Sequence, residues 1–233
     1  MSALLTLTAK EIRTLFVSPI AYAVIAVFAV LCGYSFAVSL AVAKQATLVH
    51  IFFQAAIQLV LLVPLVTMRQ FAEERRSGTL ELLLTAPIRE IDVVVAKFLA
   101  CMMVLAAMTA LTLIYAVVLG VYGQPEWGPI YSGYIGLMIL AGALVAIGLA
   151  VSALTGNQIV AAVVSLGIFG LLWAIDSLAA LLPHPLDNWL LALSLLGRFT
   201  PFALGAMYLS DFGFFLAAIL LGLFLTQRAL ARR

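Results

Sequence analysis

The sequence predicts an all-α membrane protein with six transmembrane helices. Of the 233 residues, 66% are hydrophobic and 9% are charged, whereas a water-soluble domain carries roughly a quarter charged residues. A helix needs about 20 apolar residues to cross the hydrocarbon core of a bilayer. Six runs approach or exceed that length, at residues 20–42, 48–68, 93–122, 131–154, 159–182 and 209–226. We therefore expect residues 1–233 to form a single transmembrane domain.

The basic residues predict the orientation of these six helices. If the N-terminus is cytoplasmic, two basic residues, Lys44 and Arg198, fall outside, and the other ten fall inside. The inner ones are Lys10, Arg13, Arg69, Arg75, Arg76, Arg89, Lys97, Arg228, Arg232 and Arg233. Cytoplasmic segments are enriched in Lys and Arg, so we expect both termini in the cytoplasm.

The N-terminal segment 1–18 is too short and too polar to span a membrane. It mixes leucines with Lys10, Glu11 and Arg13, a composition typical of a helix that lies in the membrane interface. Pro19 is expected to turn the chain into the first span. A plain basic flank is the alternative interpretation. A cleaved signal peptide fits poorly, because signal cores have about 7–15 apolar residues and this run has over 20.

Residues 69–92 form the one substantial cytoplasmic segment. Gly78 can end a helix in the left-handed conformation, and Thr79 can cap the next one, with Glu81 in its first turn. Pro87 is expected to end that short helix. Its apolar face consists of residues at spacings of three and four, namely Leu80, Leu83 and Leu84.

Three other features complete the expected topology. Residues 155–158 form a polar turn, with Gly156 ending the fourth span. Residues 183–210 carry an apolar stretch too short to cross, so we expect an outer re-entrant segment. Gly142, Ala146 and Ala150 recur every four residues and favour close packing of helices within the chain, with a dimer seam as the alternative.

One part of the sequence resembles a known family. Residues 68–87, Met-Arg-Gln-Phe-Ala-Glu-Glu-Arg-Arg-Ser-Gly-Thr-Leu-Glu-Leu-Leu-Leu-Thr-Ala-Pro, are similar to the signature between the second and third spans of ABC-2-type transporter permeases. The likeness is closer to the branch called gliding-motility-associated ABC permeases. Residues 10–22, 154–162 and 198–205 agree with it, so the resemblance extends over nearly the whole chain.

The resemblance implies a fold and a set of partners. It implies an in-plane N-terminal helix, six spans, a coupling helix in the first cytoplasmic loop, and location in the bacterial inner (cytoplasmic) membrane. It also implies two copies of an ABC ATPase subunit and a second membrane half. That half is either an identical chain or a related membrane protein with an extracytoplasmic domain. Membrane lipids are the remaining expected partner, and nucleic acid is not expected.

The chain itself is not expected to be an enzyme. It lacks a Gly-x-x-x-x-Gly-Lys-Ser/Thr phosphate loop, so ATP and Mg would be bound by the partner ATPase and no cofactor by this chain. His50 and His184 are isolated, whereas a metal site needs three or four converging ligands. We therefore expect no catalytic residue and no metal site.

The expected site is a surface that couples the chain to the ATPase. Its charges could instead form a solvated collar, and Glu73 and Arg76 are spaced as an i, i+3 pair. An apolar face that the chain itself does not cover favours docking. The residues assigned to ATPase coupling are Phe71, Glu73, Glu74, Arg75, Arg76, Gly78, Thr79, Leu80, Glu81, Leu83, Leu84 and Pro87.

Asp176 is the one acidic residue well inside an apolar run. Charged residues within spans commonly mark function, so Asp176 is a candidate for gating or substrate contact. It lies only six residues before the end of its run, so it could equally reach the outer interface.

The sequence thus predicts the transmembrane subunit of an ABC exporter. The alternative is a membrane scaffold that transports nothing and relays ATPase motion to an extracytoplasmic partner. The scarcity of polar residues in the spans gives this alternative weight, because a hydrophilic solute needs a polar path.

Overall fold

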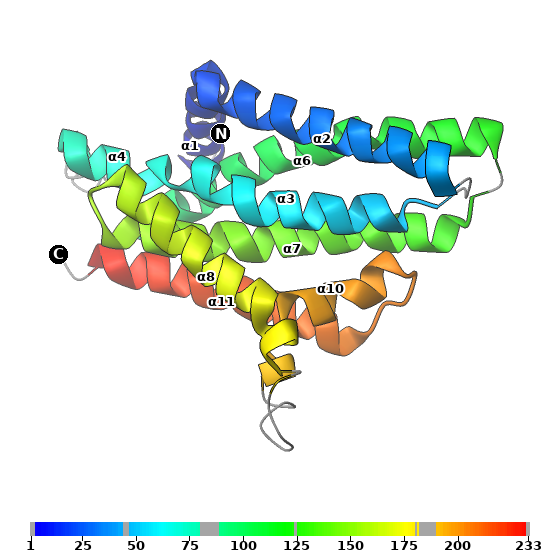
Figure 1. The fold of residues 1–233 in the computed structure, drawn as a ribbon. Helices are drawn as coiled ribbons and strands as arrows, with labels where there is room; N and C mark the ends of the chain where they lie inside the picture. Colours follow the sequence, from blue (N-terminus) through cyan, green and yellow to red (C-terminus); the bar gives the residue numbers. More distant parts are fainter. Residues whose placement is uncertain are drawn as a thin grey trace.

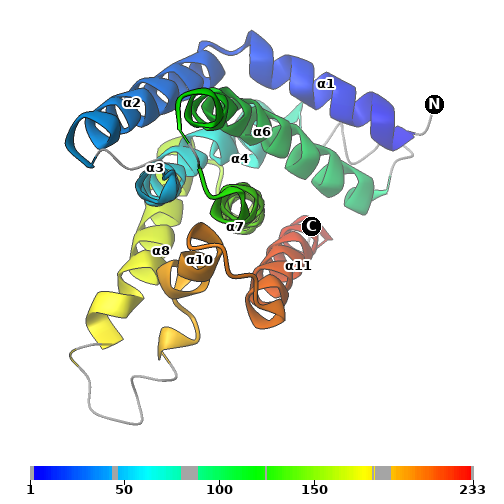
Figure 2. The ribbon, with the colours of Figure 1, turned by 90° about the vertical axis from the view of Figure 1, so that its right-hand side faces the viewer.

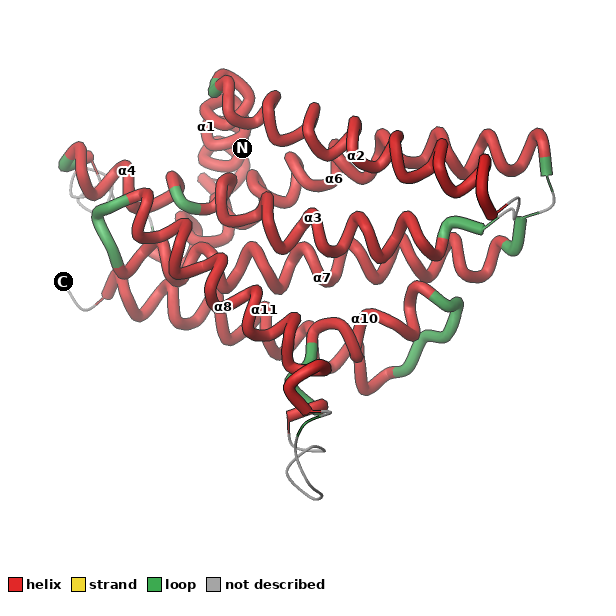
Figure 3. Tube along the Cα trace, in the orientation of Figure 1, coloured by secondary structure: helices red, strands yellow, loops and turns green. Residues whose placement is uncertain are grey.

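The computed structural model describes residues 3–43, 47–79, 89–123, 125–179, 181 and 190–231, and it contains no strand within these ranges. The helices form an elongated bundle (Figure 1). Figure 3 distinguishes these helices from the loops that connect them. They are α1 (Ala3–Val17), α2 (Pro19–Ala43), α3 (Val49–Thr67), α4 (Arg69–Ser77), α6 (Glu90–Tyr122), α7 (Trp127–Leu154), α8 (Gln158–Ala179), α10 (Leu195–Ala203) and α11 (Leu209–Ala231).

The six predicted spans are confirmed as helices long and apolar enough to cross a membrane. They are α2, α3 continued by α4, α6, α7, α8 and α11. Several boundaries differ from the expectation; for example, α7 begins at Trp127, four residues before the expected start. Helix α6 begins at Glu90, three residues early, because Glu90 and Asp92 in its first turn suit the positive end of the helix dipole. Helix α11 continues past residue 226 to Ala231.

Helix α7 is the centre of the bundle. In the end-on view of Figure 2 it lies among α3, α6, α8, α10 and α11, and α1 and α2 lie farther out. Within the most apolar stretch of each span, 78% of the residues are buried in α7, against 17% in α2 and 22% in α8 and in α11. The outer helices therefore present their large apolar side chains to lipid, and α7 presents its own to the protein.

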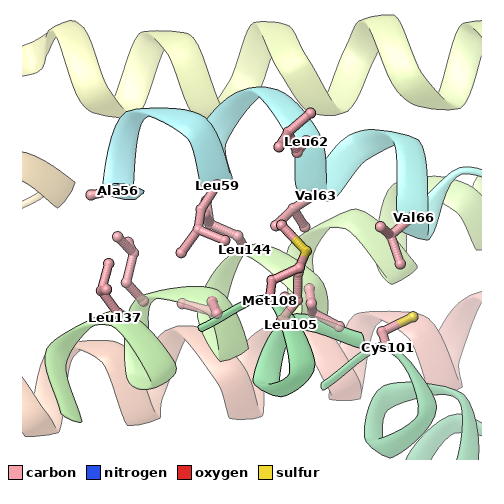
Figure 4. Packing of buried hydrophobic residues seen from close by; sticks show 14 of the residues in the cluster. Ala56, Leu59, Leu62, Val63, Val66, Cys101, Leu105, Met108, Leu137 and Leu144 are labelled. Carbon is pink, nitrogen blue, oxygen red and sulfur yellow. The ribbon is translucent and has the colours of Figure 1, made fainter. Parts of the chain in front are cut away.

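The core lies between α3, α6 and α7. Figure 4 shows Leu59 and Val63 of α3 facing Leu105 and Met108 of α6 and Leu144 of α7. All five side chains are fully buried. Protein interiors pack as densely as organic crystals, so these contacts fix the spacing of the three helices.

The small residues of α7 bring α11 into close contact with it. A Cβ atom at Gly222 of α11 would lie 2.6 Å from the carbonyl carbon of Ala146, and one at Gly142 would lie 3.0 Å from Ile219. Small residues allow such backbone approach in membranes. Gly142 and Ala146 thus contribute to packing within the chain, as the sequence favoured.

The turn between α7 and α8 differs in its detail from the prediction. The chain leaves the helix at Thr155, whose backbone is extended (φ −127°, ψ 150°), and Gly156 does not adopt positive φ. Asn157 then starts α8, because its Oδ1 accepts hydrogen bonds from the amides of Ile159 and Val160. The break therefore depends on a polar cap rather than on a left-handed glycine.

Helices α1 and α2 meet at an elbow. Helix α1 ends at Val17 and α2 begins at Pro19, as predicted, since proline is well suited to a first helical position. Figure 1 shows that α1 runs across the long helices, and Figure 2 shows it lying along α6. Leu7 and Glu11 face that contact and are buried.

Helix α10 occupies part of the predicted outer segment 183–210. Ser194 caps it by accepting a hydrogen bond from the Gly197 amide at 2.9 Å. Ser132 of α7 donates to the Phe202 carbonyl at 2.7 Å, which joins α10 to the central helix. Residues 182–189, including His184, lie outside the described residues.

We expect Gly222→Ala to destabilise the protein by about 1–3 kcal/mol, because the new methyl group would overlap the backbone of α7. Gly213→Ala on the same helix is the matched control, since its Cβ would enter open space. Thermal unfolding of the detergent-purified chain would show a lower Tm for the first variant alone. Equal Tm values would contradict the close α7–α11 packing.

Candidate functional site

A buried charge cluster joins three helices at the end of the bundle where α4 lies. The ammonium of Lys97 in α6 lies 2.7 Å from Glu74 Oε1 of α4 and 3.0 Å from Glu11 Oε2 of α1. It also sits 5.2 Å from the centre of the Phe71 ring, within the range of a cation–π contact. We call Lys97, Glu11 and Glu74 the charge cluster.

The charge cluster is deeply buried at Lys97 and Glu11 and partly buried at Glu74. The exposed fractions of the side chains are 1% for Lys97, 7% for Glu11 and 20% for Glu74. Burial of an ion is tolerated only when opposite charges and hydrogen bonds replace its water. Since one ammonium serves two carboxylates, α1 and α4 both depend on α6. Lys10 lies 3.3 Å from Glu11 and adds an exposed second cation.

Ser152 of α7 attaches α4 to the central helix. The chain turns at Met68 between α3 and α4. The hydroxyl of Ser152 donates to the Met68 carbonyl at 3.0 Å and accepts from the amides of Phe71 and Ala72, each at 3.2 Å. A side chain inserted into a helical ladder in this way allows a bend. The bend lets Phe71 pack beneath Lys97.

Other charges of α4 connect it to the elbow. Glu73 Oε2 lies 3.2 Å from Arg69 Nε, so Glu73 pairs with Arg69 at i, i+4 rather than with Arg76 as its spacing suggested. Arg69 also donates to Ser18 Oγ at 3.0 Å, between α1 and α2. The middle of α1, through Glu11 and Lys97, and Ser18 just after its C-terminal end are thus connected to α4, the helical part of the predicted coupling segment.

The remaining coupling residues are only partly within the described ranges. Gly78 ends α4 with φ 73°, as predicted, and the Thr79 hydroxyl donates to the Glu74 carbonyl at 3.3 Å. Arg76 and, on α1, Lys10 and Arg13 are exposed, and Arg75 is partly buried. The residues of the set that lie outside the described ranges are Leu80, Glu81, Leu83, Leu84 and Pro87.

Asp176 lies beside the first turn of α10. A Cβ atom at Gly197 would be 3.3 Å from its Oδ1, and a carboxylate at this position is stabilised by the helix dipole. The position therefore supplies a structural explanation for Asp176. Its gating role remains a prediction.

A second ion pair, largely buried, joins α10 to α11. Arg198 of α10 donates to Asp211 Oδ1 of α11 at 2.8 Å, and Asp211 is 3% exposed. The Arg198 guanidinium also lies 5.5 Å from the Phe214 ring. This pair holds α10 against the start of α11.

Sequence reasoning missed Lys97, Ser152 and Asp211 as site residues. Lys97 was counted only among the positive charges expected inside the cell, although it is the fifth residue of a long apolar run. A cation at such a position requires a buried partner, which was the available signal. Ser152 gave no comparable signal, because serine is common in membrane helices.

The six apolar helices define a multi-pass membrane protein. Comparison with known families identifies the family to which it belongs. The model of the ABC-2 family of transporter proteins matches residues 55–225. The chain therefore belongs to the ABC-2 transporter family, as a membrane permease subunit of a kind that typically lacks its own ATPase motif and works with an ABC ATPase. No curated protein matches the sequence.

Among the residues that the structure describes, no group of three or more His, Cys, Asp or Glu side chains could hold a metal ion. Cys32 and Cys101 are free and buried. The described site consists of ion pairs, hydrogen bonds and helix contacts.

We expect Lys97→Met to destabilise the chain by about 3–5 kcal/mol, because it leaves two buried carboxylates without their cation. Arg76→Met, at an exposed position of α4, is the control. Adding Glu11→Gln and Glu74→Gln to Lys97→Met should restore much of the Tm, since the uncompensated charges are then removed. No difference between Lys97→Met and Arg76→Met would contradict the burial of the charge cluster.

Proposed function

We propose that this chain is the transmembrane subunit of an ABC-2-type exporter driven by two copies of a separate ATPase. The segment 69–92 forms the coupling surface, and nucleotide-driven closure of the ATPase pair displaces it. The displacement changes access to a path through the membrane. Rigid helices with discrete packings transmit such movements.

The charge cluster is the observation that carries this proposal. Helix α4 leads directly into residues 80–88, where the docking leucines stand in the sequence. Because Lys97 holds Glu74 of α4 and Glu11 of α1 together, a push on α4 moves α1 and α6 with it. Glu74 serves this inner connection, so the docking contacts fall to exposed residues and to the leucine face.

The arrangement in the membrane follows from the same proposal. Helix α1 lies in the cytoplasmic interface, both termini are cytoplasmic, and the membrane is the bacterial inner membrane. Helix α10 forms an outer re-entrant segment. A second membrane half completes the transporter, either as an identical chain or as the related protein with an extracytoplasmic domain that the gliding-motility branch uses.

The interior of the described spans favours a lipid-like or amphipathic substrate. Several polar side chains there bond to one another, as Thr112 does to the Tyr134 hydroxyl at 3.1 Å and Cys32 to Gln58 Oε1 at 3.6 Å, and Gln58 Nε2 is an isolated buried group without a hydrogen-bond partner. A hydrophilic solute would need free polar groups along its path. The same observation supports the second candidate, a coupler that moves an extracytoplasmic partner instead of a solute.

Co-purification tests the coupling surface. We expect an ABC ATPase to accompany the tagged wild-type chain through gentle detergent purification, and its amount to fall at least about tenfold with Leu83→Arg or Arg76→Glu. The reason is that a buried apolar contact or a charge contact with the ATPase is lost. The ratio of chain to ATPase also distinguishes an identical from a different second half.

Glu126→Arg is the matched charge-reversal control, because Glu126 is exposed before α7, at the opposite end of the bundle from α4. It should retain the ATPase. The proposal fails if no ATPase accompanies the wild-type chain, or if all three variants retain it equally.

A further inference from the structure

A groove of about 610 Å³ runs along α7 where α11 packs against it, and Ile168 of α8 lines part of its wall. Ala150 and Val151 of α7 and Gly222 of α11 also line it and are themselves buried. Of the described residues that line the groove, Arg228 alone carries a polar side chain. The groove is therefore apolar, with a single guanidinium in its wall.

The groove lies on the lipid-facing side of the bundle. Leu221 and Phe224 of α11 line it and are 59% and 52% exposed. Arg228 follows Leu221 by seven residues, which corresponds to about 10 Å along a helix. The guanidinium thus stands near the end of α11, which is also the end of the bundle where α4 lies (Figure 1).

The N–H donors of Arg228 are free. Arg228 is exposed in the last turn of α11, and its guanidinium lies 5.1 Å from the centre of the Phe224 ring. Within the described ranges, no carboxylate pairs with Arg228 and no oxygen accepts a hydrogen bond from it. Guanidinium groups hold phosphate through paired hydrogen bonds, so the apolar groove ends at a cation that can bind one.

The sequence around Arg228 is strongly basic. After Asp211 the chain carries Arg228, Arg232 and Arg233 and no acidic residue. Basic residues at the end of a span attract anionic headgroups. A second copy of this chain is a poorer occupant, because a twofold contact places the same surface on both sides and would bring the arginines of both copies together. Charge and apolar surface therefore both favour an anionic amphiphile.

We propose that the groove binds an anionic phospholipid. The phosphate accepts hydrogen bonds from the Arg228 guanidinium, and one acyl chain lies along Ala150, Val151 and Leu221. A free anion would leave the apolar wall uncovered, and a zwitterionic lipid would bring its own cation to a surface that is already positive. The site involves neither the coupling surface nor a transport path, so the inference does not depend on the proposed function.

Quenching of a tryptophan in the groove by bromine-labelled lipids tests the proposal. Leu225→Trp places the reporter in the groove, and Val163→Trp, at an exposed position of α8 that does not line it, is the matched control. Both variants are made in the full chain with its native tryptophans replaced by phenylalanine, and are reconstituted in vesicles of unlabelled phosphatidylcholine. Brominated phosphatidylglycerol or brominated phosphatidylcholine with identical acyl chains is then added.

We expect the tryptophan of Leu225→Trp to prefer phosphatidylglycerol over phosphatidylcholine at least about fivefold, the factor expected for one basic residue near the headgroups. The preference at Val163→Trp should be less than about twofold, because only the diffuse attraction of the protein for anionic lipid acts there. Equal preferences at the two positions would overturn the proposal.

Arg228→Gln, added to Leu225→Trp, should lower the preference to less than about twofold, because the phosphate loses its charged donor. Arg13→Gln removes an exposed arginine of α1 and is the matched control. It should keep the full preference. A preference that persists in Arg228→Gln with an unchanged Tm would overturn the assignment, and so would an equal loss in Arg13→Gln.

Two further measurements exclude other occupants. Inorganic phosphate in excess, at constant ionic strength, should not relieve the quenching by phosphatidylglycerol, because it has no acyl chain to fill the groove. Relief by phosphate would indicate a free-anion site and overturn the assignment to a lipid. Protection of Leu225→Trp from both brominated lipids, with Val163→Trp still quenched, would indicate a protein contact and overturn it as well.

Discussion

The structure depends most on the need to keep Lys97 paired inside the protein. A buried ammonium without counter-charges would be unstable, and its two nearest carboxylates come from helices far apart in the sequence. This one requirement therefore sets where α1 and α4 lie against α6. Because Glu74 pairs with Lys97, its side chain faces the interior of the protein. The charged helix α4 is thereby connected to α6 and α1 within the chain.

Helix α4, which carries Glu74 of the charge cluster, is also bonded to α7, the most buried of the described spans. Ser152 of α7 accepts hydrogen bonds from the Phe71 and Ala72 amides in the first turn of α4, so the charged end of the bundle is connected directly to its core. At the same time Gly222 lets α11 approach α7 closely. The charged end of the bundle and its apolar centre are therefore both fixed by contacts with α7.

A comparable arrangement occurs where α10 meets α11. Arg198 and Asp211 form a buried pair that holds α10 to α11, and Asp176 lies at the first turn of α10. Charges in this protein thus occur where short helices meet long ones. Membrane proteins can bury charged side chains at such junctions, because an oppositely charged partner supplies the electrostatic stabilisation that lipid cannot.

The sequence by itself determined the helical class, the six spans and the left-handed end of α4 at Gly78. These features follow from local physics, namely the length of apolar runs and the conformational freedom of glycine. Only the tertiary structure decided that Glu74 and Glu11 share Lys97, that Glu73 pairs with Arg69, and that Ser152 supports the bend. The contacts of Lys97 and Ser152 join residues whose distance in space depends on how whole helices pack. Glu73 is different, because both of its possible partners lie on the same helix, Arg69 four residues before it and Arg76 three residues after it. Periodicity assigns residues to helices, but it does not choose which buried charges meet.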